Sequence, residues 1–313
     1  MPPKVLVITG PTASGKTRLA VELAKRHNGE VVSADSMQIY RRMDIGTAKP
    51  TAEEMQGIPH HMIDVADPEE DFSVARYVDM AARCVEDVLS RGRLPILAGG
   101  TGLYIDSLLS GRTFAAFDEA SPLRAELEAR YAREGGQALL NELAKADPES
   151  AARLHPNDAK RIVRALEVWL TAGKTITRHN EETRSVPPRY DALTLTLDYE
   201  RREDMWARID KRVDKMMADG LAEEVRALLR SGVPQRCTAM QAIGYKEMIP
   251  VVSGDAAAAD AAARIKLRSR QYAKRQRTWF KRNQQARRLL WGPVPNFADV
   301  LHRSTAFLEE FGI

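Results

Sequence analysis

The chain has 313 residues and a net charge of +4, with 44% hydrophobic and 29% charged residues, which suffices for one large packed domain or two ordinary ones. No run of about eighteen apolar residues occurs, which excludes a transmembrane helix, and the short apolar run at residues 5–8 lacks a following cleavage site, so we expect a cytoplasmic protein without a signal peptide. The two cysteines, Cys84 and Cys237, are too few and too far apart for a disulfide framework or a zinc site.

The first hundred residues alternate short apolar runs with amphipathic stretches. The runs at residues 5–9, 31–33 and 94–98 predict buried parallel strands. Helices are expected after residue 17 and from residue 74 onward, the second capped by Ser73 and ended by Gly92. This alternation predicts an α/β protein with a parallel sheet that is covered by helices on both faces.

From about residue 113 the pattern becomes helical as far as residue 188. Asn157 is the expected cap of one helix, Gly173 its expected end, and residues 175–188 are expected to form a loop. Residues 193–197 return to a strand pattern, and helices are expected to finish the chain. We therefore predict a core of residues 1–113 and 189–313 with an all-helical domain inserted at residues 114–188, and Gly111 and the 175–188 loop are candidate hinges.

Residues 10–17 fit the pattern G-x-x-x-x-G-K-[ST] between a predicted strand and a predicted helix, which is the context that a P-loop requires. The loop N–H groups, the helix N-terminus and Lys16 attract a diphosphate or triphosphate, and Thr17 can hold Mg²⁺. The fold expected is therefore P-loop NTPase-like. The predicted phosphate site consists of Gly10, Pro11, Thr12, Ala13, Ser14, Gly15, Lys16 and Thr17.

The residues that follow two other strands indicate what kind of P-loop protein this is. Enzymes that consume ATP commonly place an acidic residue at the end of a second apolar strand, but the run at 94–98 leads instead into the sequence GGTG. Asp35 follows the second strand and should reach the carboxyl edge of the sheet, where ligands bind. A carboxylate there can be a general base, a metal ligand or a helix cap, and the sequence leaves these roles open.

A basic segment lies near the end of the chain. Between Arg264 and Arg288 there are eleven Lys or Arg residues and no Asp or Glu. An apolar stripe of the expected helix is formed by Ile265, Tyr272, Ala273, Trp279 and Phe280, and a separate cationic face by Lys266, Arg270, Lys274, Arg277 and Lys281. Because solvated faces usually mix both signs of charge, we interpret this face as a binding site for a phosphate backbone.

Several segments together resemble the bacterial tRNA dimethylallyltransferases, over nearly the whole chain. The P-loop is shared with many families, but SADSMQIY at residues 33–40 and MDIGTAKP at residues 43–50 are quite specific. Further matches are PHHMID at 59–64, GGTGLY at 99–104, NDAKR at 157–161, MQAIGYKE at 240–247 and RQYAKRQ at 270–276. Arg42 stands where the family usually has glycine, and we expect it to tune the local geometry.

The resemblance implies Mg²⁺-dependent transfer of a dimethylallyl group from dimethylallyl diphosphate to the exocyclic amine of an adenosine. That adenosine lies 3′ of the anticodon in tRNAs that read codons beginning with U. Thr12 and Lys16 are expected to hold the diphosphate and Thr17 to face Mg²⁺. Asp35 is the expected general base, with Thr101 near the reacting centre, so Asp35, Thr101 and Lys16 are the expected catalytic residues.

The resemblance also implies RNA contacts along much of the chain, and we expect a monomer that binds the anticodon stem-loop of tRNA and no membrane. The expected RNA-contacting residues are Asp35, Ser36, Met37, Gln38, Thr101, Arg124, Asp158, Ala159, Lys160, Arg161, Gln241, Gly244, Tyr245, Lys246, Lys274, Arg275, Arg277 and Lys281.

Three other activities fit parts of the pattern. An enzyme that prenylates free adenine nucleotides needs the same P-loop and Asp35 but has no use for the helical insertion or the basic segment. A small-molecule kinase that consumes ATP fits the P-loop but not the missing acidic strand end. A nucleic-acid-binding module without catalysis leaves the P-loop unexplained.

Overall fold

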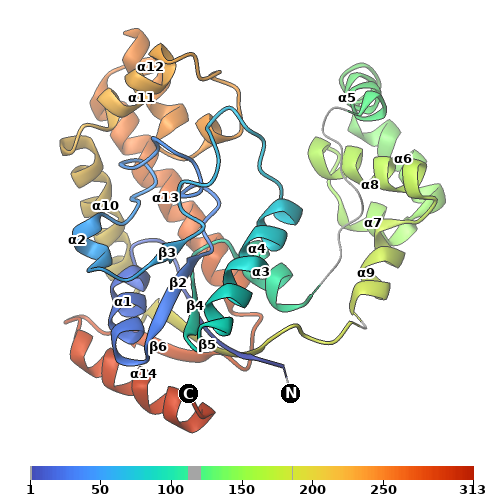
Figure 1. Cartoon of the computed structure of the whole chain (residues 1–313). Coiled ribbons are helices and arrows are strands. Elements are labelled where there is room, and N and C mark those ends of the chain that lie inside the picture. Colours follow the sequence, from blue (N-terminus) through green and yellow to red (C-terminus); the bar gives the residue numbers. More distant parts are fainter. Residues whose placement is uncertain (1, 112–120, 185) are drawn as a thin grey trace. The chain divides into compact units, whose positions relative to one another are not determined.

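The computed structural model describes residues 2–111, 121–184 and 186–313, and the chain divides into two compact units (Figure 1). One unit comprises Met1–Leu109 and Arg189–Ile313, and the other comprises Ser110–Pro188. The boundary predicted between residues 113 and 114 lies outside the described residues. Among the described residues, no helix is long and apolar enough to cross a membrane.

A six-stranded sheet is the centre of the first unit, with the strand order β3-β2-β4-β1-β5-β6. All of its strand pairings are parallel, and Leu6 in the middle of the sheet pairs with Ile96 on one side and Leu193 on the other. The sheet and its flanking helices confirm the predicted fold class. The strands are β1 (Lys4–Thr9), β2 (Gly29–Ser33), β3 (His60–His61), β4 (Leu94–Ala98), β5 (Asp191–Tyr199) and β6 (Arg287–Trp291).

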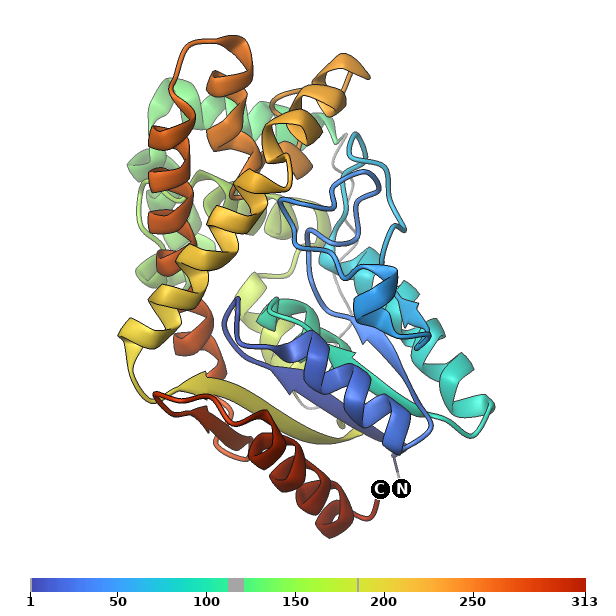
Figure 2. The same ribbon diagram turned by 90° about the vertical axis from the view of Figure 1, so that its left-hand side faces the viewer.

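Helices cover both faces of this sheet: α1 and α14 lie on one side, and α3 and α4 on the other (Figure 1). Ser73 accepts a hydrogen bond from the backbone N–H of Arg76, which confirms it as the cap of α3. The long helix α13 packs against α10 and α12 (Figure 2). The helices are α1 (Lys16–Arg26), α2 (Ala52–Met55), α3 (Val74–Ser90), α4 (Gly102–Leu109), α10 (Arg202–Ala218), α11 (Leu221–Arg230), the 3-10 helix η1 (Ala239–Gln241), α12 (Tyr245–Ser253), α13 (Ala258–Phe280) and α14 (Phe297–Phe311).

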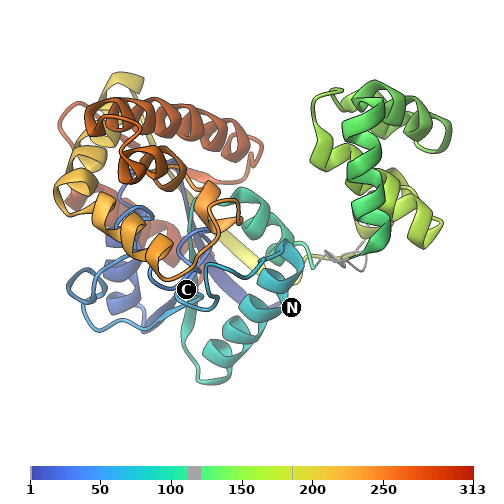
Figure 3. The same ribbon diagram turned by 90° about the horizontal axis from the view of Figure 1, so that it is seen from above.

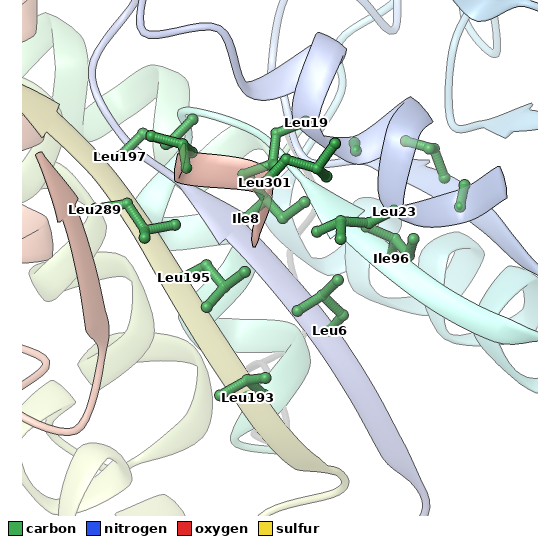
Figure 4. Close-up of a cluster of buried hydrophobic side chains, with 14 of the residues drawn as sticks. Leu6, Ile8, Leu19, Leu23, Ile96, Leu193, Leu195, Leu197, Leu289 and Leu301 are labelled. Atoms are coloured by element: carbon green, nitrogen blue, oxygen red, sulfur yellow. The ribbon is translucent and has the colours of Figure 1, made fainter. Parts of the chain in front are cut away.

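The hydrophobic core of the first unit holds its strands side by side. Leu6 and Ile8 of β1 are fully buried together with Leu195 of β5 and with Leu19 and Leu23 of α1 (Figure 4). Each such side chain stabilises the fold by roughly 1.5–3 kcal/mol relative to an exposed one. Since β1, β2 and β4 are adjacent and parallel, their carboxyl ends meet at one edge of the sheet, and the loops that follow them lie together there.

The second unit is helical throughout its described part (Figure 3). Its core packs Leu127 of the first helix against Leu139 of the second and Ile162 and Leu166 of the fourth. The helix predicted to be capped by Asn157 begins instead after Asp158, one residue later. The helices are α5 (Pro122–Glu134), α6 (Gly136–Ala146), α7 (Pro148–Arg153), α8 (Ala159–Ala172) and α9 (Ile176–Arg184).

The loop predicted at residues 175–188 is wrong for most of its length, because Ile176–Arg184 form α9. Asp147 is buried and accepts hydrogen bonds from the backbone N–H of Thr177 at 3.1 Å and from its hydroxyl at 2.6 Å. The start of α9 is therefore capped by a carboxylate from 30 residues earlier in the chain, which local sequence patterns do not reveal.

The prediction that only helices finish the chain is also wrong, because β6 adds an edge strand beside β5. Leu289 and Trp291 of this strand are buried, while Arg287 and Arg288 are exposed. The last two cations of the basic segment thus belong to a strand and not to the basic helix, which ends at Phe280.

Candidate active site

The P-loop connects β1 to α1, and its two glycines have backbone conformations that other residues adopt only with strain. Gly10 has a φ of 145°, and a Cβ atom there would lie 2.4 Å from the carbonyl oxygen of Leu197. Gly15, directly before α1, has a φ of 85°. The glycines of the sequence pattern are therefore required both by the turn and by the close packing of the loop on β5.

Side chains from distant segments hold the backbone of the P-loop. The hydroxyl of Tyr199 donates to the carbonyl of Ala13 at 2.6 Å, and the indole N–H of Trp291 donates to the carbonyl of Ser14 at 2.9 Å. The Ser14 hydroxyl itself is buried and has no hydrogen-bond partner among the described residues. A buried donor without a partner is costly, so this hydroxyl fits an oxygen of a bound phosphate group.

Lys16 and Arg212 place two cations at the P-loop. The Lys16 ammonium donates to the carbonyls of Gly10 at 3.0 Å and Pro11 at 2.9 Å. Burial and the positive charge of Arg212 lower the pKa of Lys16 to about 7, and Asp35 acts in the opposite direction. Burial lowers the pKa of Arg212 as well, again against Asp35. Lys16 and Arg212 are half-buried, and two cations this close to each other favour the binding of an anion between or beside them.

Arg212 is a site residue that the sequence analysis missed. It lies in α10, and one of its terminal nitrogens donates to the carbonyl of Thr47 at 3.4 Å. Its Nε atom is buried without a hydrogen-bond partner among the described residues. In the sequence it is one cation in a helix of mixed charge, a pattern typical of solvated helices, so only the tertiary structure reveals its position.

Asp35 lies at the carboxyl end of β2, as predicted. One of its carboxylate oxygens accepts hydrogen bonds from the backbone N–H groups of Met37 at 2.9 Å and Gln38 at 3.4 Å. The negative charge of Asp35 acts to raise the pKa of both Lys16 and Arg212, so its carboxylate lies near these two cations. The second carboxylate oxygen is not used by these N–H groups, and a base in this position can accept a proton from a bound substrate.

Thr101 lies in the loop after β4 and is joined to the Asp35 turn. Its hydroxyl accepts a hydrogen bond from the backbone N–H of Ser36 at 3.0 Å, and its own N–H donates to the carbonyl of Ala34 at 3.1 Å. A Cβ atom at Gly99 would lie 2.1 Å from the Ala34 carbonyl oxygen. The glycine-rich sequence after β4 therefore allows this close approach, and it leaves no carboxylate at the end of the strand.

The loop at residues 43–48 is fixed by a carboxylate. Glu224 accepts hydrogen bonds from the backbone N–H groups of Asp44, Ile45 and Gly46 at 2.8, 2.7 and 3.1 Å, and from the hydroxyl of Tyr245 at 2.5 Å. Tyr245 is fully buried, so the RNA contact that we predicted for it does not fit, because its ring packs in the protein interior.

Arg42 precedes this loop and has a φ of 66°, in the left-handed region that glycine adopts without strain. Its guanidinium group donates to the Ser231 hydroxyl at 2.8 Å and to the Glu69 carboxylate at 3.2 Å. The conformation explains why glycine suits this position, and the two partners compensate part of the strain of the arginine.

The cations of α13 fall into two groups. Lys266, Arg270 and Arg277, which we expected to face outward, lie within ion-pair distance of Asp214, Asp210 and Asp198, respectively. In contrast, four cations of α13 and one directly after it are exposed and have no carboxylate partner among the described residues: Arg264, Arg268, Lys274, Arg275 and Lys281. The acidic residues belong to α10 and β5. The sequence of α13 alone therefore does not show that the folded surface carries charges of both signs.

The predicted RNA-contacting residues of the second unit lie at the starts of α5 and α8. Arg124 and Arg164 both pair with the buried carboxylate of Glu167, at 3.0 and 2.8 Å. Lys160 and Arg161 are exposed at the first turn of α8. Asp158 and Ala159 are half-buried beside them, and in the first unit Gln241 and Lys246 are exposed whereas Gly244 is buried.

Comparisons with known proteins show to which family the chain is similar. Residues 38–283 match the family described as IPP transferase. The tRNA dimethylallyltransferase of Caldanaerobacter subterraneus subsp. tengcongensis is 48% identical over 279 residues, which cover 89% of each chain. That of Geobacter sulfurreducens is 46% identical over 310 residues, which cover 99% of this chain and 97% of the relative.

Two solved structures resemble the whole chain. A eukaryotic dimethylallyltransferase acting on tRNA has a TM-score of 0.82 at 30% identity, covering 98% of this chain and 80% of its own. The tRNA isopentenylpyrophosphate transferase of Bacillus halodurans has a TM-score of 0.70 at 41% identity, covering 98% and 97%. With the family match over residues 38–283 and these identities, the chain belongs to the IPP transferase family.

Proposed function

We propose that this protein transfers the dimethylallyl group of dimethylallyl diphosphate to the exocyclic amine of an adenosine in tRNA. The acceptor is the adenosine 3′ of the anticodon in tRNAs that read codons beginning with U. The observation that carries the proposal is the combination of an anion cradle with Asp35 and Thr101 beside it and no acidic residue at the end of β4. The relatives named above act on the same class of substrate.

In the proposed reaction, the allylic carbon–oxygen bond of the donor breaks and a bond forms between that carbon and the adenine nitrogen. The diphosphate leaves with the bonding electrons, and its growing negative charge is stabilised by Lys16, Arg212 and the N–H groups of the P-loop. Asp35 accepts the proton that the amine loses. General base catalysis of this kind accelerates a reaction by about 10²–10⁴-fold.

Mg²⁺ fits this site only when it binds together with the diphosphate. The described residues contain no group of three His, Cys, Asp or Glu side chains that could hold a metal ion by themselves. Thr17, the second residue of α1, is the side chain that would bind Mg²⁺, with diphosphate oxygens and water completing its shell. When bound, the ion would neutralise charge on the leaving group.

The exposed cations of both units would hold the tRNA by its phosphate backbone. We assign this role to Lys274, Arg275 and Lys281 in the first unit and to Lys160 and Arg161 in the inserted helical domain at about residues 114–188. Such contacts supply affinity and position rather than base specificity. We expect the protein to act as a monomer in the cytoplasm, where its tRNA substrates are.

The test is transfer of label from radioactive dimethylallyl diphosphate, with Mg²⁺ and without ATP, to tRNA that lacks the modification. AMP serves as the rival acceptor, and Lys16→Met and Lys25→Met serve as variants, since Lys25 is exposed on the same helix. We expect label in tRNA with wild type and Lys25→Met only. Label in AMP would favour a nucleotide prenyltransferase, and phosphate transfer from ATP to a small molecule would favour a kinase.

A further inference from the structure

Gln276 lies on the buried side of α13 and connects two loops of the active site. Its side chain is 5% exposed. The amide oxygen accepts a hydrogen bond from the backbone N–H of Thr12 at 2.8 Å, and the amide nitrogen donates to the carbonyl of Gly100 at 3.0 Å. One side chain therefore joins the P-loop, which holds the diphosphate, to the loop that carries Thr101.

The surroundings of Gln276 fit this amide closely. A Cβ atom at Gly100 would lie 2.3 Å from the Gln276 amide nitrogen, so the contact requires glycine at that position. One turn earlier on α13, the buried hydroxyl of Tyr272 interacts with the side chains of both Thr101 and Gln276. Burial, followed by the charge of Asp35, raises the pKa of this hydroxyl to about 12, so it stays neutral at physiological pH.

The contact with Thr12 also limits how the P-loop binds its ligand. Because Gln276 occupies the backbone N–H of Thr12, that N–H does not point to a bound diphosphate, and the predicted role of Thr12 is left to its hydroxyl. Instead, the N–H of Thr12 holds the P-loop in place through its hydrogen bond to Gln276. The P-loop, which would bind the donor, and the loop of Thr101, which lies beside the acceptor, are thus both held by a side chain of α13. This helix carries neither the P-loop nor Asp35.

We propose that Gln276 is a positioning residue that sets the distance between the donor carbon at the P-loop and the acceptor amine beside Asp35 and Thr101. The inference rests on the function proposed above and adds a residue to it. Bond formation requires the two reacting atoms to approach along one line, and a misplacement of about 1 Å can reduce the rate by roughly 100-fold. Tyr272 supports the same arrangement from the side of Thr101.

The variant Gln276→Glu tests this role through its pH dependence. A protonated carboxyl group reproduces the pattern of the amide, since its carbonyl accepts from Thr12 and its O–H donates to Gly100. An ionised carboxylate has no hydrogen to donate and repels the Gly100 carbonyl. Burial favours the protonated form. We therefore expect the ratio of variant to wild-type kcat to fall at least fivefold between pH 6 and pH 8.

Two further variants complete the experiment. Gln276→Met keeps the length but makes neither hydrogen bond, so its kcat should fall about 10–100-fold with no pH dependence relative to wild type. Gln56→Glu introduces the same charge at an exposed position of the described structure and should behave as wild type. The affinities for inorganic diphosphate and for tRNA, measured separately by calorimetry, should change less than kcat in both Gln276 variants.

The outcomes separate this inference from the proposed function. Wild-type protein without transfer to tRNA would overturn the function itself. An active wild type with Gln276→Glu and Gln276→Met each within twofold of it in kcat would overturn the positioning role. So would variants whose kcat and two affinities fall together with the melting temperature, because this would show a general loss of structure, and folding is checked by circular dichroism.

Discussion

The affinity of the protein for diphosphate should fall as the pH rises through about 7, because Lys16 loses its proton there. Burial and the charge of Arg212 lower the pKa of Lys16 to about 7. A diphosphate bound in the P-loop favours the ammonium form and raises this pKa. Below pH 7 the free protein already carries the proton and affinity is near its maximum, whereas above pH 7 binding must take a proton from solution.

The size of the effect follows from a single linked proton. With a pKa of about 7 in the free protein, binding should take up about 0.1 proton at pH 6, 0.5 at pH 7 and 0.9 at pH 8. The factor that Lys16 contributes to the association constant for diphosphate then falls about tenfold between pH 6 and pH 8. This corresponds to about 1.4 kcal/mol of binding free energy. This range holds as long as the bound diphosphate raises the pKa well above 8.

Isothermal titration calorimetry with inorganic diphosphate, in buffers of different ionisation enthalpy, measures the protons taken up. The ligand itself titrates in this range, so the control is Lys16→Arg, whose guanidinium stays protonated throughout. Wild type should take up nearly one proton more than this variant at pH 8 and about the same number at pH 6. Equal uptake by the two proteins at pH 8 would refute the argument that Lys16 is half-protonated near neutral pH.

Three further predictions concern other parts of the site. Asp35→Asn keeps an oxygen for the N–H groups of Met37 and Gln38, so kcat should fall about 10²–10⁴-fold with tRNA affinity unchanged, and a parallel loss of affinity would indicate a structural role instead. Arg212→Met should raise the KM for dimethylallyl diphosphate about 10–100-fold, as expected for loss of a hydrogen bond to a charged group, whereas Arg208→Met, at an exposed position of the same helix, should not. The salt dependence of tRNA binding is measured as the slope of log K against the logarithm of the salt concentration. Replacing Lys274 and Arg275 by glutamine should reduce the magnitude of this slope by about 1.5–2. The matched change of Lys266 and Arg270, which already pair with acids, should leave this slope nearly unaltered, and an equal effect of both pairs would contradict the assignment of the RNA contact.

Features that depend on neighbouring residues could be predicted from the sequence. The apolar runs that became β1, β2 and β4 predict buried strands because a strand covered on both faces needs apolar side chains throughout. The spacing of Gly10, Gly15 and Lys16 predicts a phosphate site because this turn needs backbone conformations that glycine supplies. Asp35 could be placed at the site because the carboxyl ends of adjacent parallel strands meet at one edge.

Features that depend on contacts between distant residues were decided by the tertiary structure. The sequence patterns do not show that Asp147 caps α9, that Arg212 reaches the P-loop, or that Gln276 joins two loops, because each partner lies far away along the chain. The charge pattern of α13 was misleading for the same reason, since its paired carboxylates belong to α10 and β5. A sequence determines which chemistry each residue can offer and which local backbone it prefers, whereas the packing of the helices on the sheet decides which of those groups meet.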